Sequence, residues 1–189
     1  MGLAKQWKGV NGYMIKKPST FFSAYDENHG IGYPLQFLLV TFAVAMAPVL
    51  LIGVLLNITS PTDAALVGAI VVVLGLVMWI GVVFEAVLAH AVASLFGASG
   101  LTYTLEAYAF PSLVRYGFWW FPLVNIVLAF YGLYLQIKAL SAFHDISTGK
   151  AAIAALVVPV IMFPILAVGL LLILPILLAF VLDIGGTAP

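Results

Sequence analysis

Eight ionisable side chains lie within or beside apolar stretches of this sequence, where such groups are costly and commonly functional. They are Glu85, His90, Glu106, Arg115, Lys138, His144, Asp145 and Lys150. Two kinds of chemistry are open to such a set: a pathway for protons, ions or small solutes, or ion pairs that hold helices together. Both need partners within reach, so spacing is the first thing to consider.

Glu85 takes part in both interpretations. His90 follows it by five positions, about 140° around a helix, so the two side chains do not share a face and a metal site from them is not expected. The structural interpretation pairs Glu85 with Arg115 or Lys138 of a neighbouring helix, or places this end of its helix outside the membrane. The functional interpretation joins Glu85 and Glu106 in a proton relay or ion site, because buried carboxylates can titrate near neutral pH.

Glu106 and Arg115 flank Pro111 within the stretch Leu101–Arg115. A proline frees a backbone carbonyl one turn earlier, and broken polar helices form solute sites in many transporters. The same break can simply return a loop, and no second broken segment of an inverted repeat is visible. Transport of a small solute or ion, using these two residues and Glu85, is therefore the alternative function.

The polar loop FHDISTGKA, residues 143–151, holds no recognisable catalytic set. His144 and Asp145 are adjacent and point apart, and no third partner has metal-like spacing. Ser147 or Thr148 is expected to cap the following helix, with Lys150 at the lipid headgroups. The STGK string lacks the glycine and strand of a phosphate-binding loop. With no hydrolase motif either, we expect no enzyme, no cofactor and no metal.

The composition requires a membrane. Of 189 residues, 65% are hydrophobic and 7% charged, with a mean hydropathy of +1.21, against roughly 25% charged in average proteins. Seven basic and seven acidic residues cancel, and four of the basic ones precede residue 18, so nucleic-acid binding is excluded. There is no cysteine, and hence no disulfide or thiolate chemistry.

Four apolar runs are long enough to cross about 30 Å of hydrocarbon. They are expected at residues 34–56, 64–97, 116–140 and 151–182. The second would be about 50 Å long as a helix, so it tilts or projects from the bilayer, and prolines bend the last. Leu101–Arg115 is shorter than the usual lower limit of about 17 residues for a crossing.

Positive charge decides the topology, because Lys and Arg collect on the cytoplasmic side. With the N-terminal lysines inside, a crossing at residues 101–115 places Lys138 and Lys150 inside and misplaces only Arg115. We therefore expect an all-α, polytopic transmembrane helix bundle of five crossings in the cell membrane, with a cytoplasmic N-terminus and an external C-terminus. Four crossings plus a re-entrant hairpin is the alternative.

Three segments follow from this topology. Residues 1–33 form a cytoplasmic or interfacial segment, residues 34–183 the transmembrane domain, and residues 184–189 a short tail. Lysines and aromatic residues in the first segment suit the headgroup layer. A short interfacial helix from Ser19 to about Tyr25 and a basic tail that only sets orientation are both open.

Three motifs, in their order and spacing, resemble the YIP family, the Ypt/Rab-GTPase-interacting integral membrane proteins, with prokaryotic members nearest. The resemblance covers most of the chain. KKPSTFF (16–22) contains Pro18, Phe21 and Phe22; GASGLTYTLEAYAFP (97–111) contains Gly97, Gly100, Tyr108 and Pro111; HDISTGKAAIAAL (144–156) contains Ser147, Gly149 and Lys150.

The resemblance implies a five-helix membrane domain with a cytosolic N-terminus and a non-enzymatic role as a membrane organiser or trafficking-like adaptor. The N-terminal region is shorter than in eukaryotic relatives and the glycine pair is spread to Gly97 and Gly100, so small-GTPase binding is not carried over. Expected partners are the lipid bilayer and either a second copy or other membrane proteins. Gly68, Gly75 and Gly81 would let helices approach closely in such association.

Overall fold

The computed structural model describes residues 2–27, 29–161 and 172. Regular structure in these residues is helical, with no strand among them, which confirms the all-α prediction. The helices are α1 (Leu3–Lys16), α2 (Pro18–Ala24), α3 (Gly32–Leu56), α4 (Pro61–Ser94), α5 (Leu101–Ala109), α6 (Ser112–Tyr116) and α7 (Pro122–Phe143). A further helix covers Thr148–Ile161.

Three of these helices, α3, α4 and α7, are long and apolar enough to cross a membrane. They correspond to three of the four expected runs. The third run starts at Pro122 rather than at residue 116, because Gly117–Phe121 form a turn that holds Trp119 and Trp120. The fourth run is described only as far as Ile161, and the tail at 184–189 lies outside the described residues.

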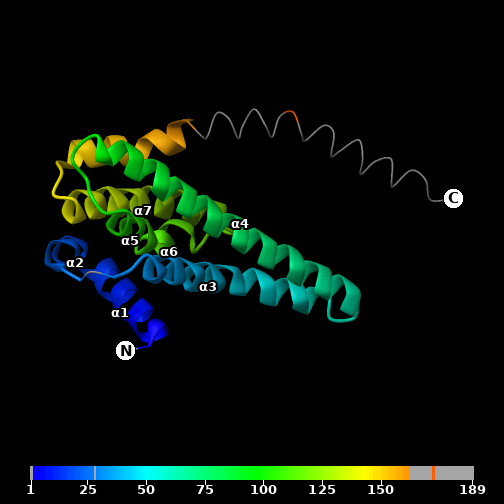
Figure 1. Cartoon of the computed structure of the whole chain (residues 1–189). Coiled ribbons are helices and arrows are strands. Elements are labelled where there is room, and N and C mark those ends of the chain that lie inside the picture. The colour runs from blue at the N-terminus through cyan, green and yellow to red at the C-terminus, as the bar shows by residue number, and fades with distance from the viewer. Residues whose placement is uncertain (1, 28, 162–171, 173–189) are drawn as a thin grey trace.

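Figure 1 shows α3 and α4 as a long antiparallel pair that reaches beyond the other helices. The turn at residues 57–60 closes the far end of this pair. The turns at residues 95–100 and 144–147 lie together at the opposite end, beside α2. The molecule therefore has a broad end, where most elements meet, and a narrow end formed by the α3–α4 hairpin alone.

The stretch Leu101–Arg115 lies in two short helices, α5 and α6, separated at Pro111. Proline lacks the backbone N–H that would continue the helix. Phe110 and Arg115 nevertheless donate regular N–H bonds, to the carbonyls of Glu106 and Pro111, both at 3.0 Å. The chain thus bends at Pro111 with little loss of backbone hydrogen bonding.

The centre of the broad end is α5. Its residues are buried without interruption from Thr104, and the buried run continues through Ser112. α5 packs against α3, α4 and α7, as expected of a helix surrounded by apolar neighbours. Two polar residues of α5, Thr104 and Glu106, are fully buried and therefore need partners inside the protein.

The N-terminal segment forms two helices that pack on the bundle. α2 begins at Pro18 with Lys17 as its N-cap, and not with Ser19 as the cap, consistent with the preference for proline in the first helical turn. Met14 and Phe22 are buried, and α2 packs against α7. The indole of Trp7 in α1 donates a 2.8 Å hydrogen bond to the hydroxyl of Thr41 in α3. This segment is helical and attached to the bundle over much of its length.

Candidate functional site

A turn that contains two glycines directs α5 into the bundle. Gly97 and Gly100 have φ angles of 99° and 80°, in the left-handed region that side chains disfavour. Gly100 also stands immediately before the first residue of α5. Two of the residues that carry the resemblance to the YIP family are therefore required by the backbone path from α4 into α5.

The first polar cluster surrounds Arg115. Its Nη1 donates to Glu85 Oε1 at 2.9 Å and to Gln136 Oε1 at 2.6 Å. The hydroxyl of Tyr116 donates to the other Glu85 oxygen at 3.2 Å. The Glu85 and Arg115 side chains are each only 12% exposed. One cationic group thus joins α4, α6 and α7.

This cluster lies within the apolar part of the bundle. Glu85 is nine residues from the end of α4, and Gln136 is seven from the end of α7, or about 14 Å and 10 Å at 1.5 Å per residue. A charge at such a depth is stable only with a close counter-charge and further hydrogen bonds. Glu85 supplies the counter-charge of Arg115, and Gln136 accepts a second hydrogen bond from Arg115. Tyr116 donates a hydrogen bond to Glu85.

A glycine on α7 allows the ion pair to form. A Cβ on Gly132 would lie 2.5 Å from the Cβ and 2.7 Å from the Cα of Arg115. Real Cβ atoms are essentially never this close to a neighbouring backbone. The backbone of α6 therefore rests directly on α7 at Gly132, and this contact places Arg115 between Glu85 and Gln136.

The second cluster links the N-terminal segment to α5. His29 Nδ1 lies 3.1 Å from Glu106 Oε1 and 3.1 Å from the Tyr25 hydroxyl, and its Nε2 lies 3.3 Å from Glu27 Oε2. The His29 ring stacks on Tyr33 with centroids 3.8 Å apart. Burial, together with the charge of Glu106, raises the pKa of Tyr25, so its phenol stays protonated. The buried Glu106 is therefore held by the segment that precedes α3.

The third cluster centres on Thr104 of α5. Its hydroxyl lies 2.8 Å from His90 Nδ1 and 2.7 Å from His144 Nε2. Because a hydroxyl has one hydrogen, it donates to one ring and accepts from the other. Burial and the neighbouring His90 lower the pKa of His144, so this ring is neutral at pH 7. The cluster ties α4, α5 and the loop after α7 together.

The remaining candidate residues lie nearer the surface. Asp145 is exposed and has a φ of 49°, while its neighbour His144 turns inward. Lys138 Nζ lies 5.9 Å from the ring centroid of Tyr134, and Lys150 Nζ lies 5.9 Å from that of Phe96. Within the described part of the chain, no group of three or more His, Cys, Asp or Glu side chains is placed so that it could hold a metal ion.

The structure thus places the eight candidate residues in separate groups. It brings together Glu85 with Arg115, and His90 with His144 through Thr104. It holds Glu106 in a different cluster from Glu85 and Arg115. The three residues considered for transport therefore do not form one hydrogen-bonded group in the described structure.

Four residues of these clusters were not among the candidates from the sequence: Tyr25, His29, Thr104 and Gln136. Tyr25 and His29 precede the first apolar run, so the cost of a polar group within a span does not single them out. Thr104 and Gln136 are uncharged, although hydroxyl and amide groups commonly form hydrogen bonds between transmembrane helices. Gln136 lies in the third apolar run and Thr104 in the stretch Leu101–Arg115, so uncharged hydrogen-bonding side chains in these segments are candidates as well as charged ones.

The family-motif residues have structural positions. Pro18 starts α2, Ser147 Oγ accepts the backbone N–H of Lys150 at 3.4 Å, and Gly149 lies in the first turn of the last described helix. Other motif residues are buried at the broad end; these are Phe21, Phe22, Tyr108 and Pro111.

These features define the class: a helical integral membrane protein whose broad end contains three hydrogen-bonded polar clusters. The family model for the Yip1 domain matches residues 12–182, which is most of the chain. The protein therefore belongs to the Yip1 domain family, in agreement with the resemblance seen in the sequence. No curated protein and no solved structure gives a significant match.

Proposed function

We propose that this protein is a non-enzymatic membrane organiser that holds an interfacial helical layer, α1 and α2, against a transmembrane bundle. The observation that supports this proposal best is the aromatic contact between the two parts. Between ring centroids, Phe110 at the C-cap of α5 lies 5.8 Å from Phe21 and 5.3 Å from Tyr25, and Phe143 of α7 lies 5.9 Å from Phe22. Such pairs contribute about 0.5–1.5 kcal/mol each beyond burial.

The polar clusters support the same proposal. Glu85 and Arg115 bind each other, and Glu106 binds His29 of the N-terminal segment. Groups used in this way stabilise one arrangement of helices. A layer fixed at the headgroups, combined with transmembrane helices of unequal length, can bend or thin a bilayer.

The proposed organiser has five crossings, with its broad end facing the cytoplasm and its N-terminus on the cytoplasmic side. The α5–α6 pair and residues 117–121 would form the short crossing, since the turns at 95–100 and 144–147 share the broad end. The chain has no cysteine, so single cysteines can report the topology. We expect Ser99→Cys and Ser147→Cys to react with an impermeant maleimide from the cytoplasm and Phe118→Cys from outside. Labelling of Phe118→Cys and Ser99→Cys from the same side would contradict five crossings.

The organiser function is tested by reconstitution and crosslinking. Wild-type protein is expected to alter vesicle shape and to form crosslinked assemblies in native membranes. Phe21→Ala should weaken both effects and expose the N-terminal segment to protease, whereas Thr20→Ala, an exposed neighbour on α2, should change neither. A monomer that captures no membrane protein and leaves vesicles unchanged would count decisively against the proposal.

A second candidate, transport of a small solute or ion, is favoured by one observation. Arg115 and Asn125 line a surface pocket of about 250 Å³ between α6 and α7. Asn125 Oδ1 has no hydrogen-bond partner among the described residues. Proteoliposomes would test this function, with Asn125→Leu expected to reduce flux. Absence of any flux of protons, cations or small anions in the wild type would remove it.

A further inference from the structure

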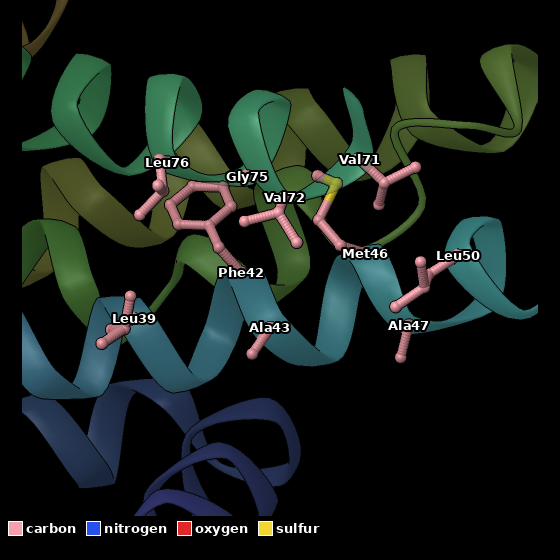
Figure 2. Close-up of a pocket in the computed structure, with 10 residues that line it drawn as sticks. All are labelled: Leu39, Phe42, Ala43, Met46, Ala47, Leu50, Val71, Val72, Gly75 and Leu76. Atoms are coloured by element: carbon pink, nitrogen blue, oxygen red, sulfur yellow. The ribbon is translucent and has the colours of Figure 1, made fainter. Parts of the chain in front are cut away.

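One pocket at the broad end is lined by hydroxyl groups and a lysine. Its volume is about 190 Å³, and α2, α7 and the start of the last described helix form its walls. Its lining includes Ser19, Ser23, Ser141, Thr148, Lys138 and the buried ring of Phe22. It differs from the pocket between α3 and α4 in Figure 2, whose lining is entirely apolar.

Lys138 gives this pocket a positive charge. Among the described residues, no carboxylate lies within ion-pair distance of its ammonium group. Lys138 is five residues from the end of α7, about 7.5 Å along the helix. Its Nζ lies 5.9 Å from the ring centroid of Tyr134, one turn earlier on α7, while Ser141 and Thr148 of the same lining lie nearer the loop after α7. The pocket is therefore positive and close to the level of the lipid headgroups.

The hydroxyls can complete an anion site. Ser141 Oγ already donates to the carbonyl of Ile146 at 2.7 Å, and Thr148 Oγ1 lies 3.5 Å from the same Ser141 Oγ. The Ser19 hydroxyl makes no hydrogen bond within the described structure, so Ser19 and Thr148 can turn their hydrogens into the pocket. Thr148 also begins a 14-residue helix, whose first N–H groups lack helical partners.

We propose that this pocket binds the phosphate of an anionic lipid headgroup. A lysine and several hydroxyl donors match the charge and the acceptor oxygens of a phosphate. The apolar part of the lining, Phe22 and Ala142, and the membrane setting of the chain favour a lipid headgroup over a free ion. This inference requires only a membrane protein and holds whether the protein organises membranes or transports a solute.

The test compares lipid binding to purified protein in neutral detergent by native mass spectrometry. Phosphatidylglycerol is the probe, phosphatidylcholine the uncharged reference, and inorganic phosphate the third arm. Wild-type protein should retain phosphatidylglycerol over phosphatidylcholine. Lys138→Gln should weaken phosphatidylglycerol binding about tenfold, equivalent to about 1.4 kcal/mol, and Thr148→Val should weaken it by a smaller factor.

Lys150→Gln is the matched control, because Lys150 lies at the same end of the molecule but does not line the pocket. It should bind phosphatidylglycerol within twofold of wild type, roughly the scatter expected without a direct contact. Equal losses in the two lysine variants, or no loss in Lys138→Gln with a retained melting temperature, would overturn the site. Binding of inorganic phosphate without selective retention of phosphatidylglycerol would overturn the lipid assignment.

Discussion

The two ends of the bundle are held together by different interactions. At the broad end, three polar clusters around Arg115, Glu106 and Thr104 join helices that are distant in sequence. At the narrow end, α3 and α4 meet through apolar side chains, and Figure 2 shows Phe42 and Met46 of α3 pointing toward α4. Many aliphatic side chains of this half are exposed; they include Leu51, Leu55, Leu66, Ile70 and Val73.

The difference follows from the solvent. In lipid, apolar side chains gain little by leaving their surroundings, so helices associate through close packing and hydrogen bonds. The narrow end relies on small residues: a Cβ on Gly75 would lie 3.1 Å from Met46 Cγ, and one on Gly68 would lie 3.8 Å from Leu50 Cδ1. These two glycines, expected from the sequence to support association, serve the contact between α3 and α4 within the chain. Gly81 has open space around it.

The largest effect is expected where the broad end loses its central charge. Arg115→Met leaves Glu85 buried without its partner, and breaking a buried ion pair in this way costs about 3–5 kcal/mol. SDS-induced unfolding of the purified protein measures the change in the free energy of unfolding. Adding Glu85→Gln should restore much of the loss, because the uncompensated charge is then removed. A single variant with wild-type stability would show that the broad end does not depend on this pair.

A smaller loss is expected at the helix contact that supports the ion pair. Gly132→Ala drives a methyl group into the backbone of Arg115, which forces α6 away from α7 at a cost of about 2 kcal/mol. Gly81→Ala on α4 is the matched control, since nothing lies within 4 Å of its added Cβ. Equal stability of the two variants in the same SDS titration would contradict the close approach.

The corresponding glycine-to-alanine substitution at the narrow end should lower the free energy of unfolding by a smaller amount. A Cβ on Gly53 would lie 2.5 Å from Val67 Cγ1, a side-chain atom that can move. The greater helix propensity of alanine, up to about 1 kcal/mol, offsets part of the clash, so Gly53→Ala should destabilise by less than about 1 kcal/mol. Val67→Ala in the same chain should relieve it. A loss of stability as large as that of Gly132→Ala would contradict the proposed difference between the two ends.

The sequence predicted some of this arrangement and not the rest, for physical reasons. Length and hydropathy predicted α3, α4 and α7, because a membrane sets the length of an apolar helix directly. Arg115 was one of two partners expected for Glu85, since few cations occur in the spans. The burial of α5 was not predicted, because its nine residues are too few for a periodic pattern to be informative. The contact of His29 with Glu106 spans 77 positions, and nothing local indicates it.

The smallest effect is expected from acid at the third cluster of the broad end. The pKa of His144 is lowered by burial and by the neighbouring His90, so the folded protein binds fewer protons than the unfolded chain. The contribution of the neutral His144 ring to the free energy of unfolding is complete above the unfolded pKa of about 6.5. This contribution is lost as the pH falls below that value. His144→Gln removes the titrating group, so its melting temperature in detergent should fall less than that of the wild type between pH 7 and pH 5.

Asp145→Asn provides the comparison for this acid response, because Asp145 is the adjacent residue but is exposed. It should keep the wild-type dependence of melting temperature on pH. His90 remains in the His144→Gln protein, so the acid response should shrink rather than vanish. Identical pH profiles for wild type and His144→Gln would mean that protonating this ring leaves the contact of α4, α5 and the loop after α7 intact. The stability of the broad end would then reside in the Arg115 and Glu106 clusters alone.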